Sequence, residues 1–124
     1  MLTKDAILAA DDLPRELVQV PEWGGEVYVR ALTGREIRPF EEAVTKETEA
    51  ATKGAAAAGG LDMPPLKALL VALTVCDEAG EALFSVGDAP ALGAKAGGVI
   101  ARLFNVAMRL NGLHDDSVKE LEGN

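Results

Sequence analysis

The side chains best suited to metal binding or acid–base chemistry gather near the C-terminus. His114, the single histidine of the chain, is followed directly by Asp115 and Asp116. An imidazole beside two carboxylates can hold a divalent metal ion weakly. A solvated turn after a helix is the favoured interpretation of this polar stretch, so we expect no metal site here and no bound cofactor elsewhere.

The remaining candidates for catalysis lack the partners that their chemistry needs. Cys76, the single cysteine, has no histidine nearby in sequence and ends an apolar run, which is typical of a buried structural thiol. The pair Gly59-Gly60 lacks the Lys-Ser/Thr of a phosphate loop, and Gly97-Gly98 follows no parallel strand. Adjacent carboxylates such as Glu41 and Glu42 point in different directions on a helix. The chain is predicted to have no catalytic residues and not to be an enzyme.

The composition of the chain limits the classes of partner that it can bind. The chain has 124 residues, with 12 Lys and Arg against 20 Asp and Glu, a net charge of −8 and a pI of about 4.6. This acidity argues against broad contact with nucleic acid, whose phosphates are bound through cations. The longest apolar run, Ala68–Leu73, is too short to span a bilayer. We expect one cytoplasmic domain over residues 1–124 that binds neither nucleic acid nor membrane.

The N-terminal third alternates in a way that predicts strands. A short amphipathic segment over residues 1–13, with Ile7 and Leu8 available to dock on the body, ends before Pro14. Two β-rich runs around Gly24-Gly25 then predict a β-hairpin over residues 15–32, since glycine supplies the positive φ of tight turns.

Helical patterns dominate the rest of the chain. Thr33-Gly-Arg-Glu36 is a capping-box pattern, followed either by a short turn and a helix from near Pro39 or by one helix kinked there. A flexible Ala/Gly connector over residues 53–61 separates this helix from an apolar one that runs from the prolines at 64 and 65 through Cys76.

Further along, residues 77–80 are predicted to form a turn, 82–84 a brief extended return and 89–94 a short helical turn broken by the glycines at 97 and 98. The last strong helix is predicted over 99–110, closed by Asn111-Gly112, before an acidic tail over 113–124. The fold class is therefore α+β and mainly helical, with an N-terminal β-hairpin followed by three to four helices.

Two apolar features are candidates for partner binding. Trp23, at the hairpin tip, can either anchor a partner or fold back on the core. The helix from residue 66 to 76 is apolar around most of its circumference, so it is either a central core helix, the favoured interpretation, or one that also buries a face in a partner. The candidate partner-binding residues are Trp23, Leu66, Leu69, Leu70 and Leu73.

Five segments in this order resemble one known family. They are the opening Leu2-Thr-Lys-Asp-Ala-Ile-Leu-Ala-Ala-Asp-Asp12, then Val20-Pro-Glu-Trp-Gly-Gly-Glu-Val-Tyr-Val-Arg30, Leu32-Thr-Gly-Arg-Glu36, Leu73-Thr-Val-Cys-Asp-Glu-Ala-Gly-Glu-Ala-Leu-Phe84 and Ala107-Met-Arg-Leu-Asn-Gly-Leu113. Together they are similar to the tail assembly chaperones of siphovirus-type (long-tailed) bacteriophages and prophages, over most of the chain except the connector.

The resemblance implies a non-enzymatic assembly factor of the host cytoplasm that is absent from the mature virion. Such a protein binds the long, helical tape measure protein, keeps it soluble, and helps to recruit tail tube subunits, mainly through a longer form made by ribosomal frameshifting. Repeated copies along a rod also favour a homo-oligomer. The alternative is a small acidic protein-binding module, antitoxin-like or adaptor-like, which would explain the same composition.

The last three residues bear on the frameshift. Glu122-Gly123-Asn124 can be encoded GAG GGA AAC, which contains a slippery sequence of the X XXY YYZ form. We therefore expect this chain to be the shorter product of a frameshifted gene pair.

Overall fold

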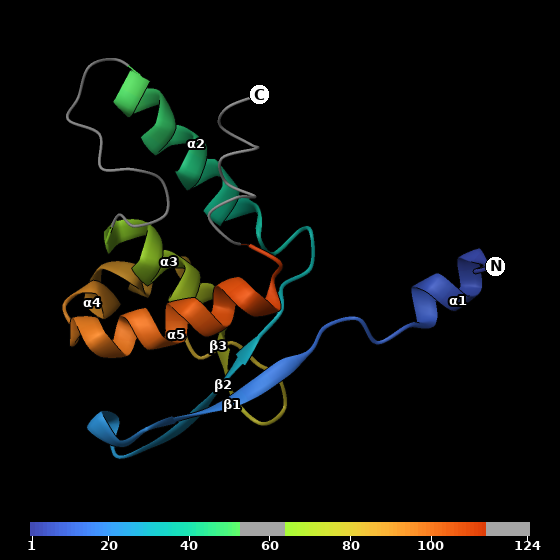
Figure 1. The fold of residues 1–124 in the computed structure, drawn as a ribbon, viewed down its shortest axis with the longest axis horizontal. Coiled ribbons are helices and arrows are strands. Elements are labelled where there is room, and N and C mark those ends of the chain that lie inside the picture. The colour runs from blue at the N-terminus through green and yellow to red at the C-terminus, as the bar shows by residue number, and fades with distance from the viewer. Residues whose placement is uncertain (53–63, 114–124) are drawn as a thin grey trace.

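The computed structural model describes residues 1–52 and 64–113 of the chain. A short helix precedes a β-hairpin, and four helices follow it (Figure 1). The elements are α1 (Lys4–Ala9), β1 (Arg15–Val20), the 3-10 turn η1 (Pro21–Trp23), β2 (Gly25–Arg30), α2 (Arg38–Thr52), α3 (Pro64–Thr74), β3 (Val75–Cys76), the 3-10 turn η3 (Val86–Asp88), α4 (Ala89–Gly93) and α5 (Gly97–Leu110). This architecture confirms the predicted α+β, mainly helical class.

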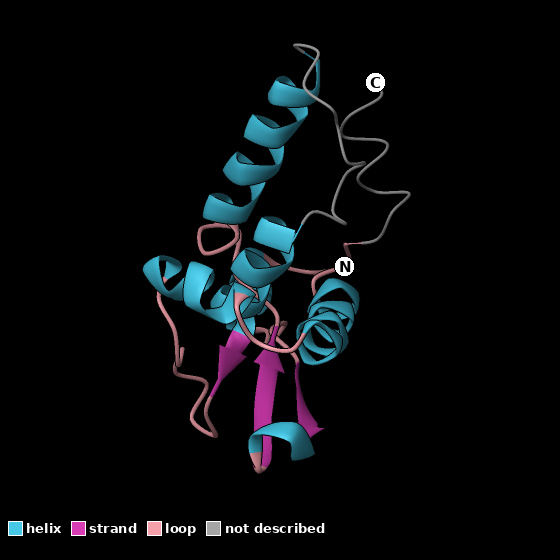
Figure 2. Cartoon of the chain, turned by 90° about the vertical axis from the view of Figure 1, so that its left-hand side faces the viewer, coloured by secondary structure: helices cyan, strands magenta, loops and turns pink. Residues whose placement is uncertain are grey.

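The strands form an antiparallel sheet in the order β1-β2-β3. Helices lie over one face of the sheet, with α3 and α5 contacting its strands (Figure 2). Between helices and sheet lies the core, whose largest fully buried side chains are aliphatic. They include Val20, Val29, Leu70, Val71, Val75, Val99 and Leu103.

The third strand corrects the sequence prediction, which continued the apolar helix through Cys76. Helix α3 ends at Thr74, whose buried hydroxyl donates a hydrogen bond to the carbonyl of Leu70 at 2.8 Å. The next two residues leave the helix because they pair with the central strand, Val75 with Val29 and Cys76 with Tyr28. A two-residue strand has no periodicity of its own, so only the sheet beside it could reveal it.

The ends of the helices follow local signals closely. Thr33 and Glu36 cap each other reciprocally at 3.0 Å, and α2 starts at Arg38, so the short turn before a helix is the correct alternative. Gly112, with a φ of +66°, ends α5, and the amide of Leu113 donates to the carbonyl of Met108 at 2.8 Å, as in a Schellman motif. The connector and the acidic tail beyond Leu113 lie outside the described residues.

Two other expectations are wrong. Gly97 and Gly98 do not interrupt a helix, because α5 begins with them and the amide of Ile100 already donates to the carbonyl of Ala96 at 3.1 Å. The N-terminal segment forms α1 but does not dock on the body: every residue from Met1 to Arg15 is exposed, and α1 stands clear of the other elements (Figure 1).

Candidate functional site

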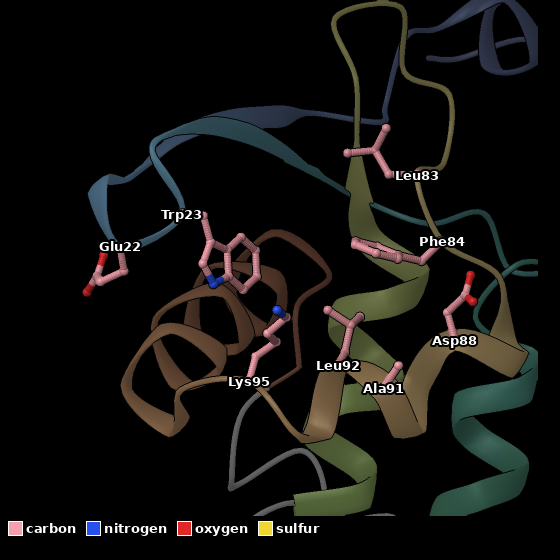
Figure 3. Close-up of a pocket in the computed structure, with 8 residues that line it drawn as sticks. All are labelled: Glu22, Trp23, Leu83, Phe84, Asp88, Ala91, Leu92 and Lys95. Carbon is pink, nitrogen blue, oxygen red and sulfur yellow. The ribbon is translucent and has the colours of Figure 1, made fainter.

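Two hollows in the surface of the described residues share α4 as a wall. The first, about 730 Å³, is here named the Trp23 groove and is lined by Glu22, Trp23, Leu83, Phe84, Asp88, Ala91, Leu92 and Lys95 (Figure 3). The second, about 610 Å³, is named the Leu69 groove and is lined by Ala43, Pro65, Leu66, Ala68, Leu69, Val86, Ala89, Pro90 and Gly93. Both grooves contain residues that the sequence singled out for partner binding.

Trp23 is positioned by the tip of the β1–β2 hairpin. Gly24, with a φ of +79°, turns the chain there, because this left-handed conformation is open to glycine. Arg102 on α5 holds the tip with a two-pronged ion pair to Glu22 at 2.9 and 2.6 Å. A similar pair, Arg109 with Glu16 at 2.8 Å, ties the other end of α5 to β1. The indole is thereby held over the body, with 36% of its surface exposed.

A second, smaller hairpin supplies the opposite wall of the Trp23 groove. The carboxylate of Asp77 accepts hydrogen bonds from the amides of Ala79 at 2.8 Å and Glu81 at 3.0 Å, which closes the predicted turn. The amide of Leu83 then donates to the carbonyl of Val75 at 3.2 Å, so the predicted extended return does pair with β3. This places Phe84 on the side of the hollow opposite Trp23 (Figure 3).

The wall that the grooves share is fixed by a capping box that the sequence analysis missed. The Asp88 carboxylate accepts hydrogen bonds from the amide of Ser85 at 2.8 Å and from its hydroxyl at 3.1 Å. The pattern Ser85-x-x-Asp88 has the same form as the recognised Thr33-x-x-Glu36, so the signal was present in the sequence. It orients η3 and hence α4, which begins directly after Asp88.

Charge distinguishes the Trp23 groove. Its two carboxylates already have partners: Glu22 pairs with Arg102, and Asp88 accepts the cap hydrogen bonds. The hydrogen bond from Arg102 lowers the pKa of Glu22 from 4.5 to about 2. Lys95, on the same rim, forms no ion pair within residues 1–52 and 64–113. The groove therefore presents aromatic surface beside one cation that is available to an acidic group.

The Leu69 groove, by contrast, has no ionisable side chain among its lining residues. Val86 leaves 48% of its surface exposed, Leu69 is half-buried, and Leu66 forms the buried base. Of the other predicted partner-binding residues, Leu70 is fully buried in the core and Leu73 is half-buried against it. The apolar helix is thus first of all a core helix, as favoured, and its Leu66–Leu69 stretch also lines a groove.

The residues considered for catalysis or metal binding form no such site within the described part of the chain. The thiol of Cys76 is buried, and burial raises its pKa, as expected of a structural cysteine. No group of three metal-binding side chains occurs among the described residues, and His114 with its two aspartates lies outside them. Within the same ranges, no helix has both the length and the apolarity needed to cross a membrane.

Comparison with known proteins shows which family and which solved structure the chain is similar to. A protein-family model described as phage tail assembly chaperone matches residues 3–123. Among solved structures, the chain is similar to the tail assembly chaperone of bacteriophage HK97, with a TM-score of 0.57 and 24% sequence identity over 86% of this chain and 94% of that chain. At this identity the likeness shows a shared fold. None of the curated proteins matches the chain.

Proposed function

The chain belongs to the phage tail assembly chaperone family, and from this premise we propose that it binds the tape measure protein of a long-tailed, siphovirus-type phage. Binding keeps the long helical protein soluble until the tail tube surrounds it. Membership in a chaperone family supports a non-enzymatic role, in which the binding surface carries the function.

The Leu69 groove is the observation that carries this proposal. A tape measure chain exposes apolar helical surface before the tube covers it, and an amphipathic helix binds by laying that surface into an apolar groove. The walls here come from α2, α3 and α4, with Leu69 and Val86 partly exposed and no lining charge to desolvate. Recognition by shape and apolarity suits a partner that presents many similar helical segments.

The charge of the chain supports the second part of the proposed function, which is to keep the bound tape measure protein soluble. A complex that buries apolar segments must itself remain dissolved, and a net charge of −8 on 124 residues opposes aggregation. Since apolar residues line the groove and acidic residues such as Glu78 and Glu81 lie at exposed positions outside it, binding and solubility depend on different parts of one surface.

The remaining parts of the proposal follow from the family resemblance. The chain acts in the host bacterial cytoplasm as a homo-oligomer and is absent from the mature virion. A longer frameshift product of the same gene recruits tail tube subunits. Sequencing the gene tests that part, since codons that forbid slippage at Gly123-Asn124, or a closed downstream frame, contradict it.

Co-expression tests the proposed binding and solubilisation of the tape measure protein. The very long reading frame expected beside this gene is expressed with and without the chain, and the soluble fraction and affinity pull-down are compared. We expect the long protein to be soluble and to co-purify only when the chain is present. Equal solubility without the chain, together with no co-purification, contradicts the proposed function.

A further inference from the structure

We propose that the N-terminal arm of this chain, defined as residues 1–13, binds in the Trp23 groove of a second copy. The proposal deepens the self-association part of the proposed function, on which it rests, and is independent of tape measure binding.

The arm concentrates apolar surface that the body does not cover. Nine large hydrophobic side chains of the described residues are exposed, and five of them belong to the arm: Met1, Leu2, Ile7, Leu8 and Leu13. Two of the other four, Trp23 and Leu83, line the Trp23 groove. Apolar surface of this extent on a segment that buries nothing marks an interaction site.

The arm's helix points to the same conclusion. Helix α1 has six residues and no buried residue, and its cap is a hydrogen bond that the amide of Ala6 donates to the Thr3 hydroxyl at 3.2 Å. Isolated helices shorter than about 12 residues are marginal in water. Helix α1 therefore needs a surface on which to lay Ile7 and Leu8 if it is to persist.

Placement favours the groove of another copy over the chain's own. The base of the arm is fixed where the amide of Ala31 donates to the carbonyl of Pro14 at 2.8 Å. From there β1, six residues or about 20 Å long, leads away to the hairpin tip that carries Trp23. Figure 1 shows α1 beyond one end of the hairpin, with the tip and α4 at the other end. The arm and the groove of one chain therefore lie at opposite ends of the hairpin. When the arm of each chain binds the groove of the next, the contact repeats head to tail and builds a ring or a spiral.

The chemistry of the two surfaces is complementary. Ile7 and Leu8 are suited to the space between the Trp23 and Phe84 rings, beside Leu83. The charged side chains of the arm are three carboxylates, Asp5, Asp11 and Asp12, and one cation, Lys4, so acidic groups are in excess. The groove offers them Lys95, which has no ion-pair partner in the described part of the chain. An acidic, apolar arm therefore meets an apolar groove with an available cation.

Cross-linking between two singly substituted proteins tests the contact. Leu8→Cys and Leu83→Cys both lie at exposed positions, and the native Cys76 is buried. The two variants are mixed under mild oxidation, with Leu17→Cys, exposed on β1 outside the groove, replacing Leu83→Cys as the matched control. We expect a disulfide-linked pair of chains from the first mixture, at least about ten-fold more than from the control.

The other outcomes overturn the proposal. No link, or an equal link with Leu17→Cys, excludes this contact, and a link formed only within single chains of the Leu8→Cys/Leu83→Cys double variant shows that the arm binds its own groove. Sedimentation adds a second readout: deleting residues 1–13 is expected to weaken self-association about ten-fold or more. A monomeric wild-type chain that still solubilises the tape measure protein overturns this inference alone, whereas a cross-linked chain that does not solubilise it overturns tape measure binding alone.

Discussion

The two grooves beside α4 differ in how they are built and in what they present. The Leu69 groove lies among helices and has no ionisable side chain in its lining, and Val86 is an exposed apolar residue at its edge. The Trp23 groove is formed where two hairpins reach the helices, and it carries an aromatic pair and Lys95. The first suits an uncharged helix face of variable sequence, and the second suits a partner with a matching charge. In our proposal the first groove binds the tape measure protein, and the second binds the arm of a second copy.

The comparison also separates what holds each groove in place. The Leu69 groove depends on the packing of α3 against α2 and α4, so it depends little on salt or pH. The Trp23 groove depends on the Arg102–Glu22 ion pair, whose groups are about 40% exposed and therefore screened by salt. Self-association is accordingly expected to weaken in high salt more than tape measure binding does.

The largest effect is expected from a substitution that unfolds the core and so removes both grooves together. Leu70 is fully buried in the core that supports them, and Leu70→Asp places an unpaired charge there, at a cost of roughly 4 kcal/mol or more. We expect loss of the native circular dichroism spectrum and of cooperative unfolding. An unchanged melting temperature shows that α3 does not occupy the centre of the fold.

A charge in one groove is expected to separate the two functions. Val86→Asp places a carboxylate in the Leu69 groove at a position that is 48% exposed, so folding is retained. Binding of the tape measure protein should weaken by at least about ten-fold, with self-association unchanged. Leu17→Asp, at a residue exposed to a similar degree outside both grooves, is the matched control. Equal loss in both variants means that overall charge, not the groove, determines binding.

The reciprocal substitution is in the Trp23 groove and tests whether the two grooves bind different partners. Trp23→Ala removes the aromatic wall of the other groove, and buried aromatic anchors contribute about 2 kcal/mol or more to an interface. We expect sedimentation to show self-association weakened about thirty-fold, with the tape measure protein still co-purifying. Loss of co-purification at unchanged oligomer mass reverses the assignment of the two grooves.

A smaller effect is expected at the wall that the grooves share. Ser85→Ala removes the hydroxyl from the Ser85–Asp88 capping box and should destabilise the fold by about 1 kcal/mol, measured by urea unfolding. Both binding activities should weaken slightly and together. Strong loss of only one activity indicates that η3 and α4 do not support both grooves.

The smallest effect is local and depends on pH. Glu22 has a folded-state pKa of about 2 against an ordinary value of 4.5, so its ion pair stabilises the hairpin tip above pH 4.5 and is lost as the pH falls from 4.5 to 2. Trp23, the single tryptophan, reports on the tip by fluorescence. We expect a red shift over that range in the wild type. In Arg102→Gln the shift should already be present at pH 7, and a normal acid transition in that variant contradicts this account of the tip.

The sequence predicted the parts of the fold that local chemistry determines. The hairpin, the cap at Thr33 and the end of α5 at Gly112 each depend on residues within a few positions of one another, and these predictions are confirmed. The strand at Val75 and the exposure of the arm depend on contacts with distant segments, or on their absence, which a single pattern does not contain. For the site, Trp23 and Leu69 were identified as apolar residues, whereas the grooves depend on the packing of α4 and on Ser85–Asp88.

Hydrogen exchange on the complex with the tape measure protein tests the central claim most directly. Amide exchange is compared by mass spectrometry for the free chain and for the chain bound to an apolar helical segment of that protein. The account predicts new protection in peptides covering residues 65–69 and 86–90, which line the Leu69 groove, and little change around Trp23 and Leu83. Protection confined to the Trp23 groove, or none in either groove, contradicts it.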